Sequence, residues 1–139
     1  PQCGGLPGMA NFTRLNLRDD VEDMAPRFGY APHAESRFAR KPLGLEQSGV
    51  SFFRLAPGFR FPFGHRHGEQ EEVYVVASGS VRMKVDDEIV ELNAWDAIRV
   101  PASSTRCPEA GPNGAELIVV GAPLTESNDA ELIQDWWTD

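Results

Sequence analysis

The sequence predicts a single-domain all-β protein, either a sandwich or a barrel. Short apolar segments recur between turn residues along the chain, as they do in these folds. Helical periodicity is almost absent from the same region, which argues against a mixed fold. The length of 139 residues fits one domain with a modest core.

The expected strands follow one another through the middle of the chain. They are residues 49–56, 59–67, 72–78, 81–85, 88–92, 97–100, 105–109 and 116–120. Turn residues such as Pro57-Gly58 and Asp86-Asp87 separate them. We divide the chain into a leader or cloning remnant (1–10), an N-terminal arm (11–48), the barrel (49–121) and a C-terminal tail (122–139). Residues 125–139 are expected to include a short helix.

Composition excludes several classes of partner. Thirteen basic and twenty-one acidic residues give a net charge of −8, and no cluster of Lys and Arg interrupts that balance. We therefore expect no nucleic-acid or membrane partner. The chain shows neither an apolar run of membrane-spanning length nor a signal-peptide pattern. Two cysteines, Cys3 and Cys107, are too few for a disulfide framework, so a reduced, cytoplasmic protein is expected.

Residues 58–79 contain the strongest candidate site. His65 and His67 would point to the same side of a strand, because successive strand side chains alternate between faces. Residues 68–71 are short enough for a hairpin, so 72–78 is expected to return antiparallel and to bring Glu72 beside the two imidazoles. Two histidines and one carboxylate form a ligand set for Fe, Mn, Ni or Zn. The sequence therefore predicts a divalent-metal site.

These residues resemble a known family. Residues 58–79 resemble the first motif of the cupins, and the region around Pro101 resembles a degraded second motif. The run Glu71-Glu72-Val-Tyr-Val-Val and the terminal Trp-Trp-Thr-Asp also resemble a group of small, mainly actinobacterial cupins. The resemblance implies a double-stranded β-helix, or jelly-roll barrel, with a small-molecule cavity between two sheets. It implies no reaction, because cupins include enzymes, sensors and storage proteins.

A homodimer is expected on two grounds. Small cupins commonly pair, and outward apolar side chains such as Val73, Val75 and Ala77 would need cover.

The second motif departs from the metal-binding pattern. Metal-binding cupins have a glycine, a Pro-x-Gly turn and a fourth ligand, histidine, where this chain has Trp95, Ser103 and Arg106. Two interpretations of Arg106 stay open. Its guanidinium could pair with Glu72 and stand where the cation would lie. Alternatively, it could swing aside from a three-ligand metal and bind the carboxylate or phosphate of a substrate.

Arg106 and Tyr74 are the predicted substrate-binding residues. Each also has a simpler structural interpretation, Arg106 as the partner of a buried carboxylate and Tyr74 as part of the core or the cavity wall. We favour a small-molecule-binding cupin that is able to hold a divalent metal. The alternatives are a metal-free ligand-binding cupin, in which Arg106 replaces the fourth metal ligand, and a vestigial cupin.

Four further residues have structural interpretations. Glu71 is a rival carboxylate, but it falls on the face opposite Glu72. Cys107 is a soft donor next to Arg106, but alternation directs it to the other face, where it would be a small core residue. The tryptophans near the end of the tail, Trp136 and Trp137, are expected to clamp the barrel or a dimer interface.

Overall fold

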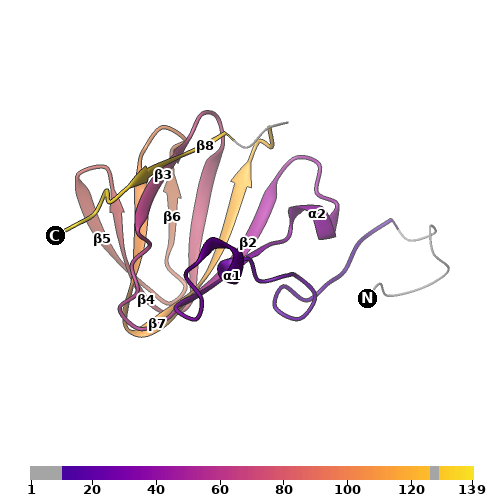
Figure 1. Ribbon diagram of the computed structural model, residues 1–139. Helices are drawn as coiled ribbons and strands as arrows, with labels where there is room; N and C mark the ends of the chain where they lie inside the picture. The colour runs from indigo at the N-terminus through magenta and orange to yellow at the C-terminus, as the bar shows by residue number, and fades with distance from the viewer. Residues whose placement is uncertain (1–10, 126–128) are drawn as a thin grey trace.

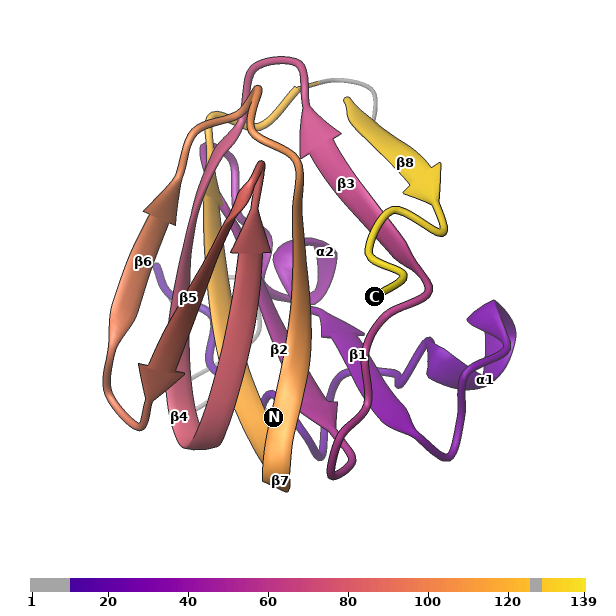
Figure 2. The same ribbon diagram turned by 90° about the vertical axis from the view of Figure 1, so that its left-hand side faces the viewer.

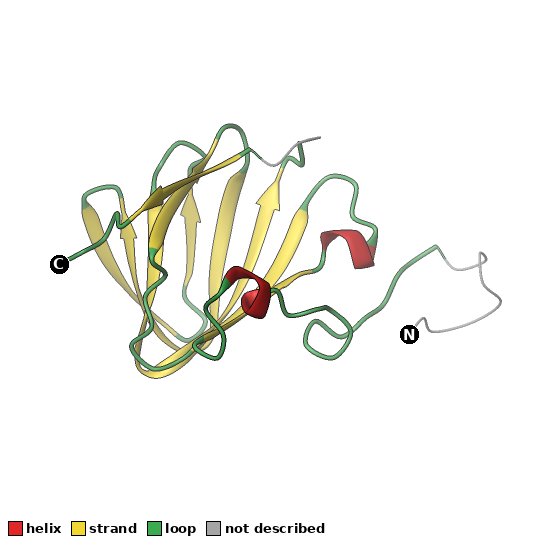
Figure 3. Ribbon diagram, in the orientation of Figure 1, coloured by secondary structure: helices red, strands yellow, loops and turns green. Residues whose placement is uncertain are grey.

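The computed structural model describes residues 11–125 and 129–139, and in this part of the chain strands dominate (Figures 1 and 3). The two helices have four residues each, α1 at Ala25–Phe28 and α2 at Arg40–Leu43. The strands are β1 (Ala34–Phe38), β2 (Gly49–Leu55), β3 (Phe63–His67), β4 (Glu71–Val85), β5 (Glu88–Asn93), β6 (Ala97–Val100), β7 (Arg106–Ala122) and β8 (Ala130–Gln134). The all-β prediction is confirmed.

The two long strands, β4 and β7, organise the sheet. They pair with each other antiparallel along most of their length, and β7 also pairs with β2 and β3. Strands β5 and β6 pair with β4, whereas β1 and β8 extend the sheet through β2 and β3. The sheet therefore curls, with β4, β5 and β6 on one side and β3 and β8 on the other (Figure 2).

Irregularities in β4 change which of its residues face the interior. Tyr74 and Val76 are buried in its first half, whereas Val81 and Met83 are buried in its second half, so the inward parity changes from even to odd. The register with β7 shifts on both sides of Gly79. Because β-bulges insert residues into one strand, such a shift changes the parity of the side chains. Both halves of β4 consequently contribute to one core.

The core lies between the two sides of the curled sheet. Its largest fully buried apolar side chains are Leu55, Met83, Leu117, Val76, Val81 and Val100. They form one cluster with Phe61, Tyr74, Val119 and Trp137. Burial of this apolar surface is the main favourable contribution to folding.

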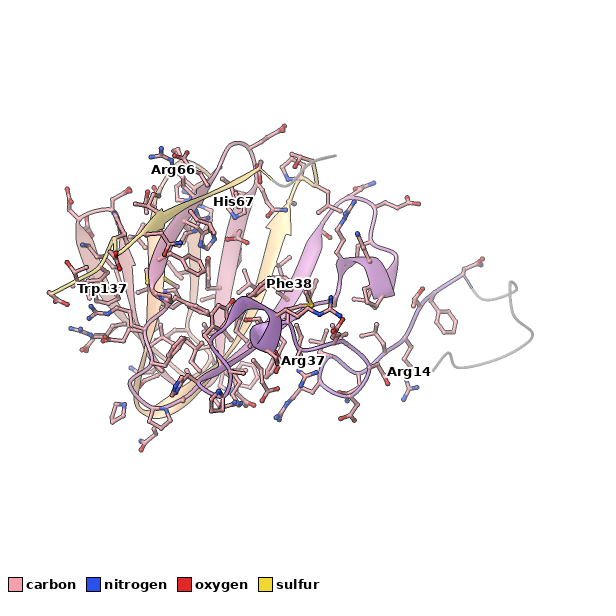
Figure 4. The ribbon with its side chains drawn as sticks, in the orientation of Figure 1. Arg14, Arg37, Phe38, Arg66, His67 and Trp137 are labelled. Atoms are coloured by element: carbon pink, nitrogen blue, oxygen red, sulfur yellow. The ribbon has the colours of Figure 1, made fainter. Side chains whose placement is uncertain are left out.

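The N-terminal arm is joined to the barrel by a strand and by aromatic contacts. Strand β1 pairs along its whole length with β2. Between α1 and β1, the ring of Tyr30 packs edge-on against Phe61, with 5.3 Å between centroids. Phe38 continues this aromatic row through its contact with Phe53, and Figure 4 shows it close to α1. The predicted strands began at residue 49, so β1 was missed.

Two local predictions were wrong. The predicted hairpin between 59–67 and 72–78 does not form, because β3 pairs with β7 and β8 while β4 pairs with β5, β6 and β7. Residues 68–70 instead connect the two sides of the curled sheet. The short helix expected within 125–139 is replaced by β8, because the backbone of β3 offers a free edge that this segment can pair with.

The predicted clamp by the C-terminal tryptophans is present on the barrel. Gly64 makes room for Trp136, since a Cβ at Gly64 would lie 2.6 Å from the Trp136 ring. Trp137 is buried, and the guanidinium of Arg60 lies 4.0 Å from its ring centroid. Arg60 also donates a hydrogen bond to the carbonyl oxygen of Trp137. Trp136 thus packs on the face of β3 opposite the two histidines, whereas Trp137 belongs to the buried cluster.

No helix within residues 11–125 and 129–139 has the length and apolar character needed to cross a membrane.

The glycine at position 79 should be essential for stability. Gly79 has φ +75°, and a Cβ there would lie 2.0 Å from the carbonyl oxygen of Gly114. We expect Gly79→Ala to lower the free energy of unfolding by more than about 2 kcal/mol, because backbone strain and a backbone clash act together. Urea unfolding followed by circular dichroism measures this change.

Gly44→Ala is the matched control. Gly44 has φ +72°, and no atom lies within 4 Å of the Cβ position. The free energy of unfolding of Gly44→Ala should fall only by the cost of the left-handed conformation, about 1 kcal/mol. Equal losses in the two variants would show that the approach of Gly114 to Gly79 does not matter.

Candidate functional site

Three strands deliver the predicted site residues to one end of the interior. His65 and His67 lie on the same side of β3, with 5.1 Å between their ring centroids. Arg66 between them points away from His67 (Figure 4), and it pairs with exposed Glu131. Glu72 lies near the start of β4 and has the inward parity of Tyr74. Arg106 begins β7, where its backbone lies directly opposite His65.

The two imidazoles and the carboxylate converge. Nε2 of His65 lies 3.4 Å from Oε1 of Glu72, and Nε2 of His67 lies 3.3 Å from the same oxygen. All three candidate ligand atoms lie within 4.8 Å of one another. Two metal bonds of about 2.1 Å that meet at a tetrahedral angle place their outer atoms about 3.4 Å apart. The spacing of these atoms is therefore compatible with ligation of one metal ion.

The state of His67 also fits a metal. Within the described residues, its buried Nε2 has no hydrogen-bond partner of acceptable geometry. A buried polar atom without a partner costs free energy, and it calls for an ion, a water or a functional role. The donor set of two imidazoles and one carboxylate suits Fe, Mn, Ni or Zn. The residues present thus fit a divalent ion.

The buried charges at the site shift the pKa values of its members. Burial lowers the pKa of His65, and the nearby Glu72 only partly offsets this effect. Burial also opposes the charged form of His67, but the carboxylates of Glu72 and Asp129 outweigh it and raise the pKa of His67. Burial alone would raise the pKa of Glu72, yet the two histidines hold it well below its ordinary value. Glu72 is therefore ionised at neutral pH and able to bind a cation.

Arg106 points into the site. It is fully buried, and its Nη2 lies 3.4 Å from Oε1 of Glu72. Its Nη1 donates a 2.7 Å hydrogen bond to the carbonyl oxygen of Ser104, which anchors the guanidinium to the loop before β7. Of the two interpretations of Arg106, this geometry matches the one in which the guanidinium pairs with Glu72. Its positive charge stands beside the carboxylate that would bind a metal.

Tyr74 completes the surroundings of Glu72. Its hydroxyl donates a 3.0 Å hydrogen bond to Oε1, and its ring is 4% exposed. Burial and the charge of Glu72 raise the pKa of Tyr74 well above its ordinary value, so the phenol stays protonated and remains a donor. Its position matches the predicted wall of the interior.

Two of the alternative residues lie away from the site. Glu71 is exposed and pairs with Arg99. Cys107 is fully buried, and burial raises the pKa of its thiol to about 12, which makes it an inert core residue as expected. Solvent reaches the site past His65, whose side chain is 22% exposed, compared with 8% for His67.

Sequence reasoning missed one member of the site, Asp129. Its Oδ1 lies 2.8 Å from Nδ1 of His67, on the side of the imidazole away from Glu72. Asp129 is 62 residues from His67 in the sequence, and it does not belong to any motif that marks the site. Only the pairing of β8 with β3 brings it here, and the helix expected for this segment concealed that pairing.

The chain belongs to the cupin family, whose Cupin domain matches residues 51–121. No curated protein matches the chain in sequence. The double-stranded β-helix predicted from the resemblance is confirmed by the strands and by solved structures of cupins.

Three solved structures illustrate the similarity. A cupin protein from Bacteroides fragilis has a TM-score of 0.68 and 22% identity, over 86% of this chain and 91% of that chain. An RmlC-like cupin from Shewanella frigidimarina has a TM-score of 0.61 and 19% identity, over 84% of this chain and 94% of that chain. An oxalate decarboxylase variant from Bacillus subtilis has a TM-score of 0.66 and 19% identity, over 83% of this chain but 30% of that chain. At these identities the similarity establishes the fold alone.

Proposed function

We propose that this cupin binds a small molecule at a divalent metal held by His65, His67 and Glu72. The observation that carries the proposal is the spacing of the three ligand atoms, 3.3 and 3.4 Å from imidazole to carboxylate, with Nε2 of His67 buried and, among the described residues, without a hydrogen bond of acceptable geometry. A bound divalent ion would supply a Lewis acid with open coordination positions. Iron, manganese, nickel and zinc all suit these donors.

Arg106 and Tyr74 would bind the ligand beside the metal. Nε and Nη2 of Arg106 are buried, and they make no hydrogen bond within residues 11–125 and 129–139. Apart from the 3.4 Å approach of Nη2 to Glu72, these donors remain available, and a planar guanidinium favours a carboxylate or phosphate group. Tyr74 adds a neutral hydroxyl next to Glu72. These features support a small anionic ligand, and they specify binding rather than a reaction.

A metal-free ligand-binding cupin is the second candidate. It is favoured by the 3.4 Å separation between Arg106 Nη2 and Glu72 Oε1, because the guanidinium already neutralises the carboxylate that a metal would need. In that form, Arg106 would be the anchor of the ligand. Metal analysis distinguishes the two candidates.

The metal proposal predicts that the protein binds a divalent ion at one site. Calorimetric titration of Zn²⁺ or Mn²⁺ into tag-free protein should show one bound ion per chain. Loss of a residue that only supports a metal ligand typically costs about 10–100-fold in affinity. His67→Ala and Glu72→Gln each remove a ligand, so each should weaken binding by more than that. His33→Ala is the control, because His33 is exposed and stacks on Phe59. A wild-type protein that binds no ion would favour the metal-free candidate.

Replacing the buried guanidinium by an imidazole should strengthen metal binding. Repulsion between a divalent ion and Arg106 at about 4–5 Å would cost several kcal/mol at an effective dielectric constant near 20. Arg106→His removes that charge and restores the family's fourth ligand, so we expect an affinity increase of roughly tenfold or more. Arg106→Met is the control that removes the charge without adding a ligand, and it should show a smaller gain. If Arg106→His binds metal no better than the parent, then Arg106 does not stand at the metal position.

We also propose a homodimer that covers the outer surface of β4 and β7. Val73 on β4 lies opposite Val120 on β7, and Val120 is 39% exposed. Sedimentation at micromolar concentration should show a dimer, and Val120→Lys should shift it toward monomer, because a buried unpaired charge destabilises an interface. Leu132→Lys, at an exposed apolar residue of β8, should leave the dimer intact. A monomeric wild-type protein would refute the proposal.

A further inference from the structure

Asp129 lies outside the residues that match the family domain, yet it contacts the candidate site. It immediately precedes β8, and β8 pairs with β3, the strand that carries both histidines. The backbone of His67 lies opposite Ala130, the residue after Asp129. This pairing holds the carboxylate against the far side of the His67 ring.

The Asp129 carboxylate is engaged at both oxygens. Oδ1 lies 2.8 Å from Nδ1 of His67. Oδ2 accepts hydrogen bonds from the backbone N–H groups of Glu69 and Gln70, at 2.8 and 3.1 Å. The backbone carbonyl of Asp129 accepts a further bond from the N–H of Gly68. One residue thus fixes both the ring of His67 and the connection that leads to Glu72.

The chemistry of the carboxylate determines which nitrogen of His67 carries the proton. Oδ2 of Asp129 accepts from two backbone N–H groups and Oδ1 faces Nδ1 of His67, and an aspartate carboxyl is ordinarily ionised at neutral pH. The ionised carboxylate can only accept, so Nδ1 of His67 must be the donor. When the imidazole is neutral, Nε2 then has no proton and directs its lone pair toward Glu72.

We propose that Asp129 is the positioning residue of the site, which holds His67 in the tautomer with a free Nε2 lone pair. The consequence for metal affinity rests on the proposed function, whereas the tautomer itself does not. Carboxylates that orient metal-binding histidines in this way typically contribute about 10–100-fold to affinity. The arrangement of the metal-binding residues would then depend on a segment that lies after the family domain.

Asp129→Asn is the sharpest test, because it keeps the shape of the side chain. The amide oxygen of the new Asn can still accept from the N–H groups of Glu69 and Gln70. Its NH₂ group must then face Nδ1 of His67, which becomes the acceptor, so the proton moves to Nε2. We expect the variant to fold normally, to show the opposite His67 tautomer, and to lose about 10–100-fold in Zn²⁺ affinity.

Two measurements test these expectations, one of the His67 tautomer and one of the Zn²⁺ affinity. Long-range ¹H–¹⁵N correlation spectra of the metal-free protein identify the tautomer, recorded at a pH above the titration of His67 located in the same series. Calorimetry measures Zn²⁺ binding. Glu131→Gln is the matched control, because Glu131 is a carboxylate on β8, two residues after Asp129, that pairs with exposed Arg66. It should change neither the tautomer nor the affinity.

The outcomes separate this inference from the proposed function. An Nε2-protonated His67 in the wild-type protein, or an unchanged tautomer in Asp129→Asn, would overturn the role of Asp129 whatever the metal does. A wild-type protein with the expected tautomer, a switch in the variant and no metal binding would uphold the positioning role and refute the metal site. A loss of affinity without a change of tautomer would reduce Asp129 to a structural contact.

Discussion

The pairing of β4 with β7 is the constraint on which the rest of the protein depends. The two strands stay paired from Glu71 opposite Ala122 to Val85 opposite Arg106, with irregularities around Gly79. A regular ladder would keep one parity inward, and half of β4 would then turn its apolar side chains to solvent. The shift at Gly79 lets the first half present Glu72 to the interior while the second half still builds the core.

The charges around Glu72 are the second constraint on the site. Glu72 faces two imidazoles and one guanidinium, so a single carboxylate serves four neighbours once Tyr74 is included. Burying a charge is tolerated when it is paired, and Arg106 supplies that pairing without an ion. A metal at the proposed site would therefore compete with the guanidinium for the same oxygen. The hydrogen bond from Arg106 to the carbonyl oxygen of Ser104 does not involve that carboxylate.

The sequence predicted the parts of the structure that follow local rules. Strand alternation placed His65 and His67 on one face, and the spacing to Glu72 placed the carboxylate near them, as the structure has it. The connection between the histidine strand β3 and the Glu72 strand β4 was predicted wrongly as a hairpin. A short connection can either close a hairpin or cross between the two sides of a sheet, and the local sequence does not distinguish these. Asp129 could not be predicted, since it reaches the site only through long-range pairing of β8.

The packing of the tail links the outer face of β4 and β7 to the interior site. Lys84 lies directly opposite Cys107 in the β4–β7 register, and its ammonium lies 4.6 Å from the ring centroid of Trp136. Opposed residues share a face of the sheet, so the thiol lies on the face that the tail covers. If the tail detached, β8 and Asp129 would leave β3, and Trp136 would leave Lys84 with them. The outer cover of this part of the barrel and the assembly of its interior site therefore depend on the same short segment.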